Sequence, residues 1–359
     1  MNRHGGDVYR YPNVLDFSAN INYMGMPQPV KAAAMRGIEE AIHYPQPDNR
    51  ELICAISDKY KLPGEYIVCG NGAAELIYLL IAALAPARAL VMAPTFSEYE
   101  QALEGYGCEV LRYLLHADQD FEPDEGFIKE IEPSIDMVFL CNPNNPTGGL
   151  VSIDYIRNVL KRCESVEAVL VIDESFLEFV PEYESSRELL EGSDHLFILQ
   201  SFTKMYAMPG LRLGCAFCSN QKLMEALRAR IQPWNISLPA QYAGIAALQE
   251  TKYVENTQHA LMVEREYLME QLRLIGLETS ILMIVYDGAA NFLLFRSVPE
   301  LWNLCMDEGV MLRDCSNFAG LGAGWYRTAV RSRQENTQLV EAIRRACMKL
   351  QSEVKKGME

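Results

Sequence analysis

The chain has 359 residues and a hydrophobic content of 49%, which is typical of a globular protein with two domains, or with one large domain and an appendage. Its formal net charge of −16 disfavours a nucleic-acid duplex or an anionic membrane surface as a partner. The N-terminal residues have no signal-peptide pattern, and the longest apolar run, residues 76–85, is about half a membrane span. We therefore expect a cytoplasmic protein with reduced cysteines and neither a membrane nor a nucleic-acid partner.

Short apolar segments alternate with amphipathic segments between residues 65 and 219. This pattern predicts helices at residues 72–86, 96–107 and 152–164, the last with Ser152 as N-cap. Continuous apolar strands separated by helices favour an α/β fold with a mostly parallel sheet that helices cover. The predicted strands occupy residues 65–70, 89–94, 108–115, 137–143, 167–174, 195–204 and 211–219.

The pattern changes after about residue 220. A long helical stretch at residues 256–276 is followed by strand-like segments at 290–297, 309–316 and 326–332, and then by a final helix at 333–354. We expect a large domain at residues 41–250 and a smaller α+β domain at 251–359. The N-terminal arm, residues 1–40, is expected to join the smaller domain.

Polar or glycine-rich motifs follow five of the predicted strands. They are "GNGAAE" at 70–75, "PTFSEY" at 94–99, "CNPNNPTGG" at 141–149, "DESF" at 173–176 and "SFTK" at 201–204. Open α/β sheets bind their ligands beyond the carboxyl ends of their strands, so these motifs predict one shared ligand site. By contrast, Cys215 and Cys218 form a lone CxxC in a strand, where they face opposite sides, and no metal site is predicted.

Two of these motifs suit a phosphate group. "GNGAAE" predicts free N–H groups at the start of a helix, and "SFTK" supplies two hydroxyls with an arginine eight residues after the lysine. Ordinary turns and turn capping are the alternative interpretations. The candidate phosphate contacts are Gly72, Ala73, Ala74, Ser201, Thr203 and Arg212.

Lys204 and Asp173 suggest covalent chemistry on a pyridine ring. A lysine amine forms a Schiff base with a carbonyl group where its surroundings favour the neutral amine. Asp173 ends an apolar strand, where a carboxylate is costly unless it meets a cation such as a protonated pyridine nitrogen. Asn145 could donate to a ring oxygen and Phe96 could cover a ring face, although Phe96 is equally consistent with core packing.

These motifs, in this order and spacing, resemble fold-type I pyridoxal-phosphate enzymes of the class I/II aminotransferase family over nearly the whole chain. The resemblance implies pyridoxal 5'-phosphate as cofactor, with Lys204 as the Schiff-base lysine and Asp173 at the pyridine nitrogen. It implies a homodimer with shared active sites, in which Tyr44 reaches the cofactor phosphate of the other subunit. The remaining implied cofactor contacts are Gly72, Ala73, Ala74, Phe96, Asn145, Ser201, Thr203 and Arg212.

Two branches of this family compete for the substrate. The chain length and the Tyr-Pro pair at 44–45 resemble histidinol-phosphate aminotransferases. Residues 4–25 and "LRDCSNF" at 312–318 more closely resemble the threonine-phosphate decarboxylases of the cobalamin pathway. That second resemblance implies a small phosphorylated amino acid, with Arg327 on its carboxylate, Arg313 on its phosphate, and His4 and Asn20 as further substrate contacts. Surface ion pairs for the arginines and a disordered terminus for His4 are the alternatives.

Phe176 stands where aminotransferases of this group usually have a tyrosine that donates to the ring oxygen. With the N-terminal resemblance, it favours decarboxylation of L-threonine-O-3-phosphate to (R)-1-amino-2-propanol phosphate. Three alternatives stay open. Phenylalanine at position 176 could be a replacement for tyrosine without functional effect, the enzyme could be an aminotransferase, or its substrate could be L-serine-O-phosphate, which has one methyl group fewer. A cofactor-binding transcription regulator is disfavoured by the net charge and by the lack of room for a DNA-binding domain.

Overall fold

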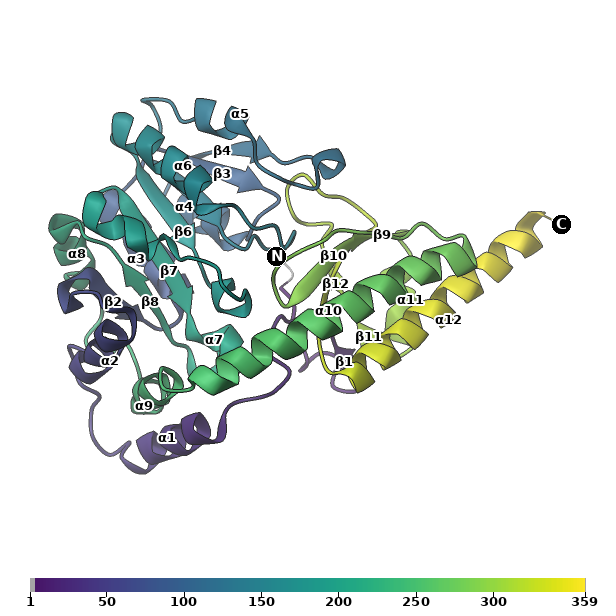
Figure 1. Ribbon diagram of the computed structural model, residues 1–359, viewed down its shortest axis with the longest axis horizontal. Coiled ribbons are helices and arrows are strands. Elements are labelled where there is room, and N and C mark those ends of the chain that lie inside the picture. The colour runs from purple at the N-terminus through teal and green to yellow at the C-terminus, as the bar shows by residue number, and fades with distance from the viewer. Residues whose placement is uncertain (1–3, 359) are drawn as a thin grey trace.

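The computed structural model describes residues 4–358, and its largest element is a seven-stranded sheet (Figure 1). Neighbours from β7 to β4 are parallel, whereas β8 is antiparallel to both β2 and β7, so the predicted mostly parallel sheet is confirmed. Across the sheet the order is β2 (Ile67–Gly70), β8 (Gly214–Phe217), β7 (Leu196–Ser201), β6 (Val169–Asp173), β5 (Met137–Cys141), β3 (Arg88–Ala93) and β4 (Glu109–Leu114).

Successive side chains of a strand point to opposite faces of the sheet, and here both faces are apolar. Helices therefore cover both faces. In β3, Leu90 and Met92 belong to one hydrophobic cluster, while Val91 belongs to the other. The cluster that contains Val91 also takes in side chains of three helices: α3 (Ala73–Leu84), α4 (Glu98–Gly105) and α8 (Gln221–Arg228).

The opposite face packs under α6 (Ile153–Ser165), which begins where it was predicted. Ser152 Oγ accepts a hydrogen bond from the Tyr155 N–H at 3.2 Å and is the N-cap. Cys215 and Cys218 belong to different clusters, which confirms that they face opposite sides. The other helices of this region are α2 (Arg50–Tyr60), α5 (Glu125–Lys129), α7 (Phe202–Met205) and α9 (Leu238–Ala247).

The C-terminal part forms a separate antiparallel sheet beside two long helices (Figure 1). Its strand order is β12 (Arg313–Asp314), β13 (Trp325–Ala329), β10 (Phe292–Arg296) and β9 (Ile284–Val285). The helices are α10 (Thr251–Thr279), α11 (Leu301–Asp307) and α12 (Arg333–Met358).

The N-terminal segment contributes to both parts of the molecule. β1 (Leu15–Asp16) pairs in parallel with β11 (Val310–Met311), so residues 309–316 split into two short strands in different sheets. In contrast, α1 (Gln28–Glu39) packs on α9, and a Cβ atom at Gly37 would lie 2.6 Å from Pro239. The division into residues 1–40, 41–250 and 251–359 remains a prediction.

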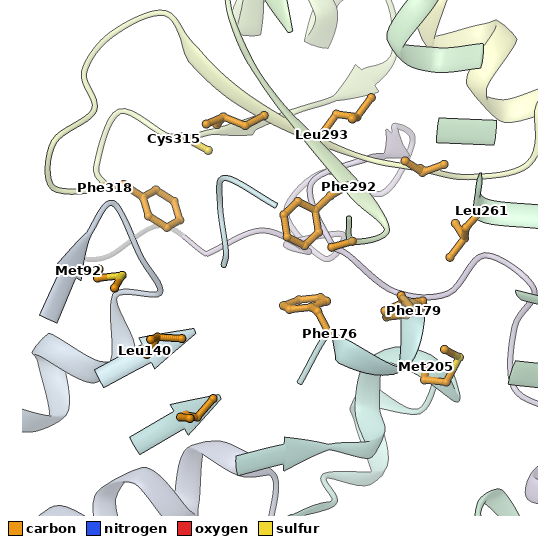
Figure 2. Close-up of a cluster of buried hydrophobic side chains, with 14 of the residues drawn as sticks. Met92, Leu140, Phe176, Phe179, Met205, Leu261, Phe292, Leu293, Cys315 and Phe318 are labelled. Atoms are coloured by element: carbon orange, nitrogen blue, oxygen red, sulfur yellow. The ribbon is translucent and has the colours of Figure 1, made fainter. Parts of the chain in front are cut away.

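Aromatic side chains fill the space between the two sheets. Figure 2 shows Phe176, from the loop after β6, opposite Phe292 of β10. Their ring centroids are 5.1 Å apart in an edge-to-face arrangement, and both rings are buried. This contact joins the C-terminal sheet to the loop that follows β6 in the large sheet. Within the described residues, no helix combines the length and apolar character needed to cross a bilayer.

Candidate active site

The predicted strand-end residues lie around one cavity at the carboxyl edge of the parallel strands. Asp173 and Ser201 end β6 and β7, and the parallel register brings their strands to the same edge. Phe96, Asn145, Phe176 and Lys204 line this cavity and also an adjoining one. The first cavity, the inner one, is completed by Ala73, Ala74, Ile77, Tyr99, Cys141, Asp173, Ser175, Ser201, Thr203 and Arg212.

Lys204 lies in the single turn of α7, directly after the end of β7. Its Nζ donates a hydrogen bond to Thr203 Oγ1 at 2.9 Å, and the Ser201 and Thr203 hydroxyl oxygens are 2.7 Å apart. Burial lowers the pKa of Lys204 to about 8; the charge of Asp173 opposes this change, and Arg212 and Arg327 add to it. The amine is therefore neutral in a much larger fraction of molecules near neutral pH than an ordinary lysine.

Asp173 is buried, and the protein holds both of its carboxylate oxygens. Oδ2 accepts a hydrogen bond from the Tyr99 hydroxyl at 2.7 Å, and Oδ1 accepts one from the Ser175 N–H at 2.9 Å. Tyr99 was not among the site residues predicted from the sequence. Its position three residues after Phe96 was the available signal, but a buried tyrosine in α4 is indistinguishable from a core residue until the distant strand β6 is placed beside it.

The residues predicted to bind the cofactor phosphate lie at the start of α3, beside Arg212. Gly72 has a φ of +82°, and a Cβ atom there would lie 2.3 Å from the Arg212 guanidinium, so this turn requires glycine. The N–H of Gly72 donates to the Gly70 carbonyl, so the expectation of a free N–H at Gly72 is wrong. Ala73 and Ala74 are in the first turn of α3, where the helix supplies no carbonyl for their N–H groups.

Arg313 and Arg327 line the adjoining, outer cavity and lie directly opposite each other on β12 and β13. Both side chains are buried. Arg327 donates to the Asn145 side-chain oxygen and, at 2.7 Å, to the Ser18 carbonyl. Arg313 donates to the Asn317 Oδ1 at 2.9 Å. In the part of the chain that the structure describes, neither guanidinium forms an ion pair with a carboxylate, and Arg327 Nε is buried without a partner.

The N-terminal arm lines one side of the outer cavity. Asn20 is 5% exposed, lines this cavity, and has no hydrogen-bond partner for either side-chain amide atom among the described residues. His4 also lines the cavity, and its Nε2 lies 3.1 Å from Glu98 Oε1 of α4. The arm itself is held by the Gly6 N–H, which donates to Ser18 Oγ at 2.7 Å.

Tyr44 lies apart from both cavities of its own chain. It is 78% exposed and stacks on Trp234, with ring centroids 4.6 Å apart. The structure thus brings together every other predicted site residue, with Gly72 at the edge beside Arg212. The functional roles of these residues remain predictions.

Comparisons with known proteins point to the same family as the arrangement of these site residues. The profile of the family Aminotransferase class I and II matches residues 12–343. The threonine-phosphate decarboxylase of Salmonella typhimurium is 35% identical over an alignment of 352 residues, and the match covers 95% of each chain. A solved histidinol-phosphate aminotransferase from Clostridium acetobutylicum is 32% identical with a TM-score of 0.86, and the match covers 93% of this chain and 99% of that chain.

A second solved structure, the L-threonine-O-3-phosphate decarboxylase from Porphyromonas gingivalis, is 25% identical with a TM-score of 0.79. The match covers 91% of this chain and 97% of that chain. The family profile spans residues 12–343, and the site at the strand ends contains a lysine, an aspartate, and an arginine beside the start of a helix. The chain therefore belongs to the class I and II aminotransferase family.

Proposed function

We propose that the chain is a pyridoxal-phosphate-dependent carboxy-lyase that converts L-threonine-O-3-phosphate to (R)-1-amino-2-propanol phosphate in cobalamin biosynthesis. One observation carries this choice of substrate. Arg313 and Arg327 are buried and directly opposite each other, and their hydrogen-bond partners are neutral groups. The substrate would bring one carboxylate and one phosphate to this pair of cations.

The arginine pair is electrostatically costly without an anion. Like charges directly opposite each other on neighbouring strands repel, and burial removes the water that would screen them. Burial lowers the pKa of Arg313 and lowers that of Arg327 to about 10. Guanidinium groups bind carboxylates and phosphates through paired hydrogen bonds, so a ligand with two anionic groups compensates both charges.

The residues of the inner cavity fit pyridoxal phosphate, the cofactor of this family. Lys204 would bind its aldehyde, Asp173 would hold its ring nitrogen, and Arg212 with the first turn of α3 would hold its phosphate. Phe96, which lines both cavities, would cover a face of the ring. When bound, the cofactor accepts the electron pair that the departing carboxylate leaves behind.

The protein's contribution is orientation and proton transfer. Arg327 and Arg313 would hold the two anionic ends of the substrate, and attachment of its amine at the cofactor end supplies a third fixed point. Three fixed points restrict rotation about the Cα–N bond, and positioning of this kind is worth several kcal/mol of activation free energy. The Lys204 amine, with its pKa of about 8, is placed to return a proton to Cα after CO2 leaves.

Replacing Arg313 by alanine is expected to weaken binding of O-phosphothreonine far more than binding of threonine. A buried guanidinium that pairs with a phosphate contributes roughly 2–5 kcal/mol, and threonine has no phosphate to lose that contact. Calorimetry or inhibition constants with both ligands measure the difference. Arg296→Ala, at an exposed position of β10, is the control. Equal losses for both ligands would remove Arg313 from the phosphate role.

A substrate panel tests the proposed function against its alternatives. We expect the highest kcat/KM with L-threonine-O-3-phosphate and a lower value with L-serine-O-phosphate, since one methyl group is worth about 1–3 kcal/mol. Histidinol phosphate is included because the Clostridium acetobutylicum structure is an aminotransferase of similar fold. Turnover of histidinol phosphate with 2-oxoglutarate, but not of the phosphorylated amino acids, would identify an aminotransferase instead.

We further propose a homodimer in which Tyr44 reaches the partner's cofactor phosphate. Large apolar side chains are exposed near Tyr44: Ile38 by 64%, Ile42 by 87% and Trp234 by 46%. Exposed apolar groups of this size mark an interaction surface. We also propose a cytoplasmic location, because all ten cysteines are free, as in a reducing compartment.

Exchange of Tyr44 for phenylalanine is expected to weaken cofactor binding about tenfold, because a hydrogen bond to a phosphate is lost while the stacking on Trp234 is kept. Mixing this variant with Lys204→Ala should regenerate sites that have both a lysine and a tyrosine. Sedimentation should show a dimer, and cofactor-limited turnover of the mixture should exceed that of either variant. A mixture with no such gain would place Tyr44 outside the partner's site.

A further inference from the structure

Tyr99 is a buried polar side chain of the inner cavity to which neither the sequence nor the proposed chemistry assigns a role. It is 0% exposed, and its hydroxyl donates to Asp173 Oδ2 at 2.7 Å. The other carboxylate oxygen, Oδ1, accepts from the Ser175 N–H at 2.9 Å. Each carboxylate oxygen therefore accepts a hydrogen bond from a protein group, and the two bonds together fix the plane of the carboxylate.

The ring of Tyr99 is itself held on two sides. It stacks on Phe139 of β5, with centroids 4.8 Å apart and an interplanar angle of 19°. It also meets Phe96 edge-to-face, with centroids 5.5 Å apart. Phe96 lies three residues before Tyr99, in the loop that leads into α4. Residues 96–99 therefore contain both the Phe96 ring, which lines the cavity, and the Tyr99 hydroxyl, which donates to Asp173.

A buried carboxylate needs such donors to stay ionised. Burial disfavours the charged form, and hydrogen bonds donated to the charged form favour it. The titratable side chains that interact with Asp173 include Tyr99, Cys141 and Lys204. Burial, and next the charge of Asp173, raise the pKa of Tyr99 well above its usual value, so this phenol remains a donor throughout the working pH range.

We propose that Tyr99 is a positioning residue that holds the Asp173 carboxylate by a hydrogen bond and aims it at the ring nitrogen of the bound cofactor. The inference rests on the proposed function for the identity of that cofactor. The hydrogen bond fixes the direction of the Asp173 carboxylate, and the edge-to-face contact with Tyr99 holds the Phe96 ring in place at the cavity. Tyr99 thereby acts on the cofactor through two other side chains.

The test compares Tyr99→Phe with the wild type by cofactor titration. The variant keeps the ring that packs on Phe139 and loses only the hydroxyl. We expect the dissociation constant for pyridoxal phosphate to rise about tenfold, since one buried hydrogen bond to a charged group is lost. Tyr326→Phe is the matched control: Tyr326 is equally buried, but its hydroxyl donates to the Val298 and Pro299 carbonyls.

A second readout is the pH midpoint of the visible absorbance of the bound cofactor. A weaker positive charge at the ring nitrogen repels a second positive charge at the Lys204 nitrogen less strongly, so the midpoint should move upward in Tyr99→Phe. Tyr326→Phe should leave it unchanged. In an Asp173→Asn background, Tyr99→Phe should cause little further change, because the two side chains act as one unit.

The outcomes are separable. Wild-type affinity and an unmoved midpoint in Tyr99→Phe would overturn the role of Tyr99 while leaving the proposed function intact. Equal losses in Tyr99→Phe and Tyr326→Phe, or a full additional loss in the Asp173→Asn background, would also overturn it. A wild-type protein that binds no pyridoxal phosphate would overturn the proposed function, and this inference with it.

Discussion

Replacing Lys204 by alanine is expected to abolish covalent attachment of pyridoxal phosphate and to reduce turnover roughly 10³-fold or more. The substitution removes the nucleophile and the proton-transfer group together. Borohydride reduction of the wild type followed by peptide mapping should place the label on Lys204. Its environment supports this expectation: the amine contacts Thr203 Oγ1 at 2.9 Å, and burial lowers its pKa to about 8.

The control for this experiment is Lys222→Ala, an exposed lysine of α8. It should keep the visible absorbance of the bound cofactor and full turnover. A label on another lysine, or a Lys204→Ala variant that retains near-normal turnover, would show that the site has been misassigned.

Asparagine at position 173 is expected to leave the fold and part of the cofactor binding intact but to reduce kcat roughly 100-fold or more. Asparagine has nearly the same shape but no charge, so it cannot hold the ring nitrogen protonated. A missing electrostatic contact of this kind typically costs 10²–10³-fold in rate. Cofactor content and kcat, measured on the same sample, separate binding from chemistry.

Asp136→Asn is the matched control for Asp173→Asn. Asp136 is exposed, its carboxylate accepts hydrogen bonds from the Ala87 and Arg88 N–H groups at the entry to β3, and it lines neither cavity. We expect its kcat to match that of the wild type. A similar kcat for both variants would give Asp173 a structural role.

The parts of the site that were predictable from the sequence lie at the ends of parallel strands. Asp173 ends a short apolar strand, and Lys204 and Asn145 follow two others. Parallel strands end at one edge of the sheet, so the convergence of these residues was expected, and the structure brings them to one cavity. The order and spacing of the motifs then identified the family, which the profile match confirms.

The parts that were not predictable depend on contacts between distant residues. Tyr99 reaches Asp173 across 74 positions of the chain, and nothing in its local sequence separates it from a core tyrosine. Arg313 faces Arg327 only because residues 309–316 split between two sheets, a matter of strand register. His4 meets Glu98 because the arm crosses the outer cavity.

The central claim is that this chain removes the carboxylate of a phosphorylated amino acid, and carbon dioxide release tests it most directly. Holoenzyme is given carboxyl-labelled L-threonine-O-3-phosphate without any keto acid. We predict labelled CO2 over many turnovers, one amine product per CO2, and a cofactor that remains in its aldehyde form. Turnover that requires 2-oxoglutarate, retains the label in the product and leaves pyridoxamine phosphate would contradict the claim and identify an aminotransferase.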